Sequence, residues 1–223
     1  MDTNAQIISD LQHKIGFQKP LDFLNDWKGI PVIVKGYIQE VQNEAIVFRL
    51  EPPDSICFAR NEYTLILHGI FIMGIQARIL ACDLQNGIAE LGEFTYSNRG
   101  FGERATVRVQ PDAPITAELS FDKTTISCKV LDISLNGFGL STKSIGDLKD
   151  AKGKAICIKL RLLEQEIEIP GTVVGIFLKE DSLRLAISFA QDAPNHDVIS
   201  RYIAHRRVEI RQEIQTAYQE AVG

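Results

Sequence analysis

Short runs of β-branched and aromatic residues, each about as long as one strand, follow one another along most of the 223-residue chain. Such runs, bounded by Gly, Asn, Asp or Pro, are typical of half-buried β-strands. In the first half of the chain the runs are PVIVKGYI (31–38), EAIVFRL (44–50), YTLILHGIF (63–71), IQARILACDL (75–84) and IAELGEFTY (88–96). Asn86-Gly87, between the last two runs, is the signal of a two-residue hairpin turn. We therefore expect a compact antiparallel β unit over residues 30–96.

The stretch SNRGFGE, residues 97–103, interrupts this pattern with two glycines and few apolar residues, as an interdomain joint would. Seven further runs follow it: TVRVQ, ITAELSF, TTISCKVLDIS, GFGLS, AICIKLRLL, QEIEIPGTVVGIFL and LRLAISF. Seven short strands joined by turn-rich loops indicate a second small barrel or sandwich. The expected fold class is therefore mainly β, with two small antiparallel β-barrels in tandem.

Helical periodicity is confined to the two ends of the chain. Apolar residues at Ile7, Ile8, Leu11 and Ile15 predict a short N-terminal helix. From Asp192 onward the period is helical again. One face of this segment carries Ile199, Ile203, Ile210, Ile214 and Ala217, and the residues expected away from it are Arg201, Arg206, Arg211 and Gln212. Acidic residues offset the basic ones, which favours a helix packed on a barrel over a membrane-surface helix.

The expected domain limits follow from these patterns. They are residues 1–97 for the N-terminal β domain, 98–103 for the linker, 104–191 for the second barrel and 192–223 for the C-terminal helix. The first residues lack the basic start and the apolar run that a signal peptide has. The most apolar stretch, residues 64–81, is interrupted by His68, Gln76 and Arg78. We therefore expect a cytoplasmic protein that does not insert into a membrane.

Charge and cysteine content exclude several classes of function. The formal net charge is −5 and the pI is about 5.4, whereas binding to nucleic-acid polymers needs a broad basic face. The four cysteines form no CxxC pair, and the four histidines form no metal-ligand pattern. Buried, reduced thiols are the favoured interpretation, and no metal or cofactor is expected.

Arg99, Arg104 and Arg108 nevertheless gather in and just after the expected joint. Arg104 and Arg108, in RATVR, are four residues apart and so project to the same side of an extended or a helical backbone. Composition alone gives about 0.65 RxxxR pairs in a chain like this one. A solvated pair is therefore the default interpretation of these arginines taken by themselves.

The motif DISLNG, residues 132–137, is a DxSxxG pattern at the end of an expected strand, and composition gives only about 0.05 such matches. On a strand, Asp132 and Ser134 project from the same face. Asn136 and Gly137 then turn the chain, and Gly137 permits a positive φ and the close approach of a ligand. Arginine can fork onto guanine O6 and N7 or neutralise phosphate, and a carboxylate can accept the N1 and N2 protons of guanine. Together these groups suit an anionic guanine nucleotide.

RATVR followed by DISLNG in a small β domain resembles the PilZ domain, a bacterial receptor for cyclic di-GMP with the signature RxxxR and then (D/N)xSxxG. The resemblance covers about residues 98–191, and the layout resembles the two-domain YcgR-like proteins. It implies that Arg104 and Arg108 grip the guanine edges and phosphates, that Asp132 and Ser134 bind from the barrel surface, and that Asn136 and Gly137 shape the corner. Arg99 is close enough in sequence to contribute, although no motif position assigns it.

The resemblance also implies how the protein works. A ligand that bridges the arginines to the barrel would order the joint and alter the binding of a protein partner, in motility, biofilm or exopolysaccharide control. The flanking residues Glu103 and Ala105 differ from the second arginine found in many family members, which leaves one ligand or a stacked pair open.

Other functions stay open at the level of sequence. A related domain that binds no ligand and acts only as a protein adaptor is the main alternative. Catalysis is disfavoured, because Ser134 lacks a GxSxG context and no P-loop or GxGxxG is present. The N-terminal β unit resembles split barrels, and we expect partner binding or homodimer formation there, with Val32, Ile33, Val34, Ile66, Phe71 and Ile72 in its core.

Overall fold

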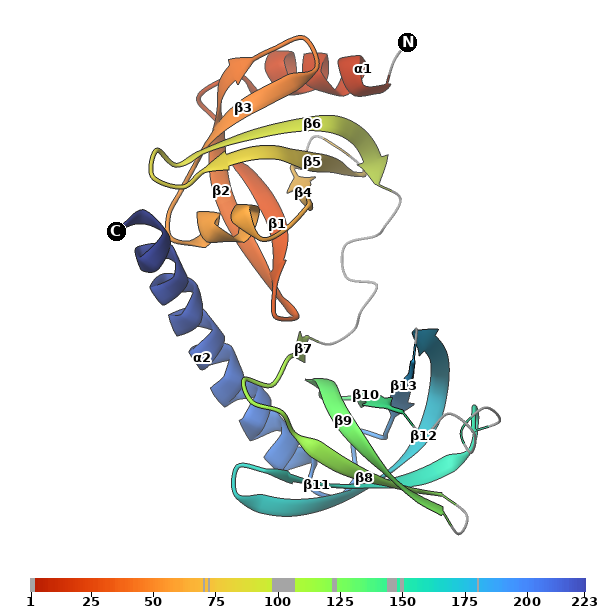
Figure 1. The fold of residues 1–223 in the computed structure, drawn as a ribbon. Coiled ribbons are helices and arrows are strands. Elements are labelled where there is room, and N and C mark those ends of the chain that lie inside the picture. Colours follow the sequence, from red (N-terminus) through yellow and green to blue (C-terminus); the bar gives the residue numbers. More distant parts are fainter. Residues whose placement is uncertain are drawn as a thin grey trace. The chain divides into compact units, whose positions relative to one another are not determined.

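The computed structural model describes residues 3–69, 71, 73–97, 107–121, 124–143, 148, 151–179 and 181–223. The chain forms two compact units. The N-terminal unit comprises residues 1–105 together with 210–223, and the C-terminal unit comprises residues 106–209. Each unit is built on a β-barrel (Figure 1).

The N-terminal unit is a closed antiparallel barrel with the strand order β1-β2-β3-β6-β5-β4. Its strands are β1 (Leu21–Trp27), β2 (Ile30–Val41), β3 (Ala45–Leu50), β4 (Tyr63–Leu67), β5 (Gly74–Asp83) and β6 (Ile88–Ser97). The helix α1 (Thr3–Asp10) and the π-helical turn η1 (Leu11–Ile15) precede the barrel, and the 3₁₀ helix η2 (Asp54–Ala59) lies between β3 and β4. The expected N-terminal helix and antiparallel β unit are confirmed.

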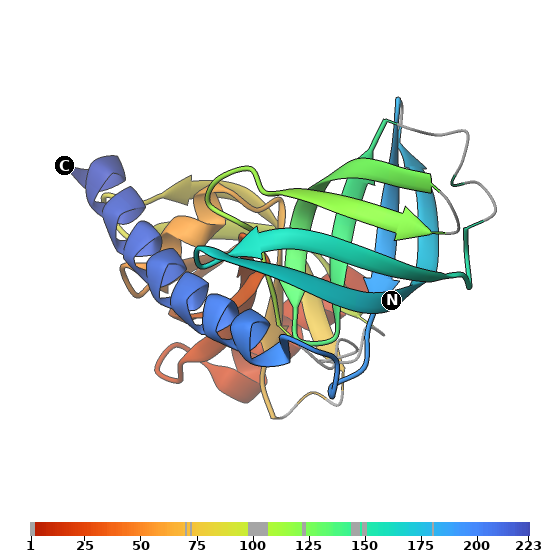
Figure 2. The same cartoon turned by 90° about the horizontal axis from the view of Figure 1, so that it is seen from below.

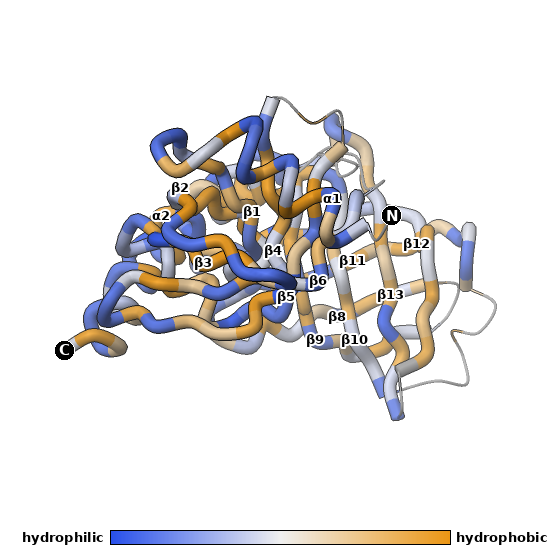
Figure 3. Tube along the Cα trace, turned by 90° about the horizontal axis from the view of Figure 1, so that it is seen from above, coloured by the Kyte–Doolittle hydropathy of each residue, from blue (hydrophilic) through white to orange (hydrophobic). Residues whose placement is uncertain are grey.

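Hydrophobic and hydrophilic residues alternate along the strands of this barrel, as Figure 3 shows, and the hydrophobic side chains fill its core. The rings of Phe48 and Phe58 both pack edge-on against Phe23, with centroids 5.1 Å and 5.5 Å away. Val32, Val34 and Ile66 are buried as expected, and Phe71 packs partly buried against the core. Ile33 is 52% exposed, so its expected place in the core is wrong. The reason is that β2 alternates, which turns Ile33 to the face opposite its two neighbours. Ile72 lies outside the described residues.

Two local features of this unit differ from the expectation. Strand β1 was not predicted, because Asp22, Asn25 and Asp26 dilute its apolar residues. The hairpin at Asn86-Gly87 has a four-residue loop, residues 84–87, where the dipeptide predicts a two-residue one. The carboxylate of Asp83 accepts hydrogen bonds from the backbone and side-chain amides of Asn86, and Gly87 takes a φ of 65°. These contacts stabilise the longer loop.

The C-terminal unit is a second antiparallel barrel, in which β9-β8-β11-β12-β13-β10 closes through the pairing of β10 with β9. The short strand β7 adds to the free side of β9. The bounds are β7 (Arg108–Val109), β8 (Thr116–Phe121), β9 (Thr124–Ser134), β10 (Gly137–Thr142), β11 (Ala155–Leu162), β12 (Gln165–Lys179) and β13 (Ser182–Ser188). Each of the seven expected runs therefore contributes a strand. The strands, coloured green to blue, curve into the barrel in Figure 2.

The C-terminal helix α2 (His196–Val222) is confirmed, but one part of its expected pattern is wrong. Arg206 was expected away from the apolar face, yet only 1% of its side chain is exposed. Its Nε donates to the carbonyl of Gln110 at 2.8 Å, and its Nη1 lies 3.0 Å from Glu209 Oε2. Burial is possible because these oxygens replace water around the guanidinium. Further along the helix, Ile210 and Ile214 are buried in the core of the N-terminal unit.

The four cysteines are all free, as expected for reduced thiols. Cys57 and Cys128 are buried, whereas Cys82 and Cys157 are only partly buried. Burial raises the pKa of the Cys57 thiol to about 12, with Asp54 and Asp26 adding to the effect. Such a thiol stays protonated and is a poor nucleophile at neutral pH.

Within the described residues, no helix is long and apolar enough to cross a membrane.

Candidate ligand-binding site

A buried carboxylate holds two arginines on the surface of the C-terminal barrel. Asp132, near the end of β9, has a side chain that is only 10% exposed. Its Oδ1 lies 3.4 Å from Nη1 of Arg108, which begins β7, and its Oδ2 lies 2.7 Å from Nη2 of Arg184 on β13. Residues 24 and 52 positions from Asp132 in sequence therefore meet at one side chain. The carboxylate fixes both guanidinium groups while leaving each side chain substantially exposed.

A glycine on the neighbouring strand makes room for this carboxylate. Gly139 on β10 pairs directly with Asp132, and the register between β9 and β10 shifts immediately after this pair. A Cβ atom at Gly139 would overlap both carboxylate oxygens of Asp132. The missing side chain thus gives Asp132 the space it occupies beside β10, from which it reaches Arg184 on β13. Sequence reasoning missed Gly139, because it lies just beyond the DxSxxG pattern.

The turn of the motif, between β9 and β10, is held by its own side chains. The buried hydroxyl of Ser134 donates to the carbonyl of Gly137 at 3.0 Å. Gly137 does not take the positive φ that the turn sequence suggests. Glycine is required there for a different reason, since a Cβ atom would overlap the carbonyl oxygen of Ile187 on β13. Gly137 therefore allows β10 and β13 to approach closely at the corner of the site.

Two contacts from outside the motif anchor the turn. The carbonyl of Leu135 accepts a hydrogen bond from Nε2 of His196, the first residue of α2, at 2.9 Å. The carbonyl of Asn136 accepts one from the backbone amide of Phe189 at 3.1 Å. Oδ1 of Asn136 is buried and has no hydrogen-bond partner in the described part of the chain. The turn is thus fixed by its backbone, and a buried acceptor is left at the corner of the site.

The structure describes five of the seven residues expected at the site and brings these five together. Arg108 pairs in register with Ser134, and Ser134 therefore lies beside the ion pair between Arg108 and Asp132. Asn136 and Gly137 form the turn that follows. Arg99 and Arg104 lie outside the described residues. Half of the RxxxR motif is therefore placed at the DxSxxG motif.

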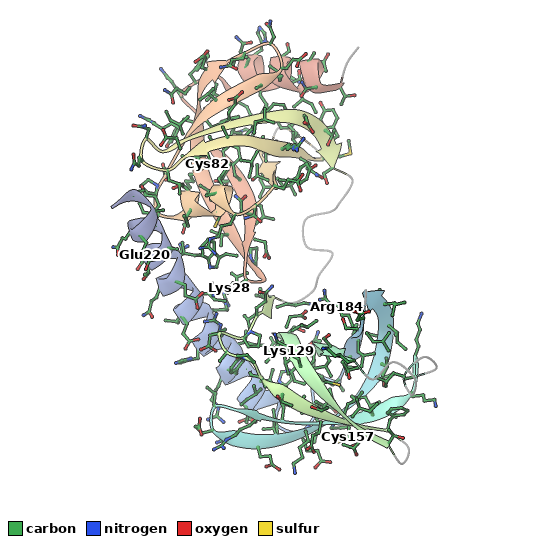
Figure 4. All side chains as sticks on the ribbon, in the orientation of Figure 1. Lys28, Cys82, Lys129, Cys157, Arg184 and Glu220 are labelled. Atoms are coloured by element: carbon green, nitrogen blue, oxygen red, sulfur yellow. The ribbon has the colours of Figure 1, made fainter. Side chains whose placement is uncertain are left out.

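Cations dominate this face of the barrel although the whole chain is acidic. Across the strands, Lys129 pairs with Ser141 and Ser141 with Arg184, so these side chains share a face. Figure 4 labels Lys129 and Arg184 at the part of the barrel formed by β9, β10 and β13. With Arg108 and one carboxylate, Asp132, the described residues make a local cationic surface. Arg184 could not be found from the sequence, since a lone arginine in an alternating strand is usually solvated.

No group of three or more His, Cys, Asp or Glu side chains is arranged to hold a metal ion in the described parts of the chain. The site is thus built from guanidinium groups, a carboxylate, a lysine and a tight turn. Guanidinium groups bind planar acceptors, either the O6/N7 edge of guanine or a phosphate. The arrangement suits an anionic, purine-containing ligand.

The sequence of this part of the chain matches a known family model, and the match extends over residues 103–205. It includes every candidate site residue except Arg99, and it includes the start of α2. Residues 103–205 are a PilZ domain. The PilZ domain thus contains Arg108 and Asp132 together with the turn that follows them. No curated protein matches the chain.

Several solved structures are similar to the chain over both of its units. YcgR from Escherichia coli, solved in complex with c-di-GMP, is 16% identical with a TM-score of 0.44, covering 95% of this chain and 92% of YcgR. MrkH from K. pneumonia, also with c-di-GMP, is 15% identical with a TM-score of 0.47, covering 94% of each chain. The inhibitor of motility MotI/DgrA from Bacillus subtilis is 13% identical with a TM-score of 0.41, covering 87% of this chain and 98% of that one.

Proposed function

We propose that this protein is a non-enzymatic receptor for cyclic di-GMP. The observation that carries the proposal is the Asp132 cluster, in which one buried carboxylate holds Arg108 and Arg184 beside the DxSxxG turn of a PilZ domain. The cluster offers cationic hydrogen-bond donors on a rigid surface, as recognition of an anionic guanine nucleotide requires. The PilZ match supports this receptor role and points to no catalytic family.

In this proposal the site residues have distinct roles. Arg104 and Arg108 bind guanine edges and phosphates of the ligand. Asp132 acts mainly by holding arginines, since each of its oxygens already accepts from one guanidinium. Ser134 and Gly137 keep the turn in shape, and Asn136 shapes the corner beside them. Arg99 is a further candidate contact from its position in sequence.

We also propose that the ligand acts through the segment between the two units. Arg104 follows residues 98–103 directly in sequence, and Arg108 lies four positions further on. A ligand held by these arginines and by the barrel would restrain this segment and change the surface offered to a protein partner. We expect the output in motility, biofilm or exopolysaccharide control, within the cytoplasm.

Isothermal titration calorimetry of the full chain with cyclic di-GMP tests the proposal. The wild type should bind with micromolar or tighter affinity, and the stoichiometry should distinguish one ligand from a stacked pair. Arg108→Ala should weaken binding about tenfold or more, since a bidentate contact between arginine and guanine is worth about 1–3 kcal/mol.

Arg161→Ala is the matched control, because Arg161 lies in the same domain, is exposed and pairs only with the nearby Glu164 among the described residues. It should bind like the wild type. Absence of binding by the folded wild type would overturn the receptor proposal and favour an adaptor that acts only through protein contacts.

A further inference from the structure

Arg184 belongs to neither sequence motif, yet it makes the shorter of the two ion pairs with Asp132. Its side chain remains 40% exposed. The hydrogen bond to Asp132 uses one of five guanidinium N–H donors, and within the described residues no other acceptor meets the group. The guanidinium is therefore oriented from below by a buried anion while donors stay available toward solvent.

An exposed aromatic side chain lies on the strand next to Arg184. Phe177 on β12 pairs directly with Arg184 on β13, so the two side chains share the outer face of the barrel. Phe177 is 56% exposed. Its ring lies over Gly175, where a Cβ atom would be 2.8 Å from Cε2 of the ring. A large apolar ring is thus held against the sheet with much of its surface in contact with water.

The cross-strand row that begins at Asp132 continues through three residues with small or no side chains. Asp132 pairs with Gly139, Gly139 with Ala186, and Ala186 with Gly175. The carboxylate of Asp132 occupies the space beside Gly139, and the ring of Phe177 occupies the space beside Gly175, so Ala186 is the small residue between them. A base placed above Ala186 would therefore lie between the Asp132–Arg184 pair and the phenyl ring.

We infer that Arg184 is a ligand-binding residue that reads the O6/N7 edge of a guanine base, with Phe177 packed against that base. The inference rests on the proposed cyclic di-GMP function and adds a subsite on β12 and β13 to it. A base is favoured over a phosphate because an exposed aromatic ring stacks on a base but makes no favourable contact with a phosphate. The forked guanidinium matches the two acceptors on this guanine edge.

Calorimetry with two ligands tests this contact. The first ligand is cyclic di-GMP, and the second is an analogue in which carbon replaces N7 of both guanines. Arg184→Ala should weaken binding of cyclic di-GMP about tenfold or more. The fold loss between the two ligands should be smaller in Arg184→Ala than in the wild type or Arg161→Ala, because one contact to N7 is already gone. Phe177→Ala should weaken both ligands by a similar factor, about fivefold or more.

Arg184→Lys keeps a cation beside Asp132 but removes the fork, so it should behave like Arg184→Ala toward the two ligands. Wild-type affinity in either variant, or the same fold loss between ligands in Arg184→Ala as in the wild type, would overturn the inference. Unchanged affinity in Phe177→Ala would overturn the part assigned to that ring. If the wild type binds neither ligand, the proposed function itself fails, which is a separate result.

Discussion

At the scale of single residues, the site depends on Asp132 being buried and yet able to reach two arginines. A buried carboxylate is stable only when its oxygens have partners, and here each oxygen accepts from one guanidinium. Gly139 is the residue that leaves room for this arrangement. Gly139, on a different strand, therefore allows the position of Asp132, and Asp132 in turn holds the two arginines.

Gly139→Ala should accordingly impair ligand binding without touching a charged group. The added methyl would displace the carboxylate of Asp132 and disturb its pairs with Arg108 and Arg184, so we expect affinity for cyclic di-GMP to fall about tenfold or more. Calorimetry on a variant with a wild-type circular dichroism spectrum measures the effect.

Gly69→Ala provides the control, because a Cβ atom at Gly69 would meet no atom of the described residues within 4 Å. Equal affinity of Gly139→Ala and the wild type would show that the position of Asp132 is irrelevant to binding.

At the scale of elements, the strand-length runs predicted nearly the whole barrel framework. Each run maps onto a strand because β-branched and aromatic residues alternate with polar ones there. β1 was missed because its buried residues are interleaved with Asp22, Asn25 and Asp26, of which Asn25 is itself buried. Local composition does not report the tertiary contacts that make such a strand stable.

The candidate site was only partly predictable. Asp132 and Ser134 follow from a local motif, but Arg184 comes from a distant strand and reaches Asp132 only once the barrel closes. Helix α2 shows the same limit, since the burial of Arg206 depends on the carbonyl of Gln110, 96 residues away. Pairings between distant segments leave no periodic signal in the chain.

Arg206→Ala should destabilise the C-terminal unit. The change leaves the Gln110 carbonyl without its Nε donor and removes the buried stem of the side chain, so we expect a loss of about 1–3 kcal/mol. Scanning calorimetry should record a midpoint several degrees lower than that of the wild type.

The neighbouring Arg207→Ala is the control, since Arg207 is exposed on the same turn of α2 and its loss should leave the midpoint nearly unchanged. Matching midpoints for the two variants would contradict a stabilising role for Arg206.

At the scale of the whole molecule, the chain connects the N-terminal barrel to the PilZ domain through residues 98–103, and helix α2 contributes residues to both units. We expect saturating cyclic di-GMP to change the small-angle X-ray scattering profile of the wild type, because the ligand would restrain the segment that precedes Arg108. At a ligand concentration between the Kd values of the two proteins, Arg108→Ala should stay closer to its ligand-free profile than the wild type does. Identical wild-type profiles with and without ligand would contradict the rearrangement while leaving binding intact.

The most direct test of the central claim is a crystal structure of the full chain with cyclic di-GMP bound. The account predicts the ligand on the outer face of the C-terminal barrel, with Arg108 and Arg184 on its guanines or phosphates and Asp132 beneath them. A ligand bound elsewhere on the chain, with the Asp132 cluster making no contact to it, would contradict the account.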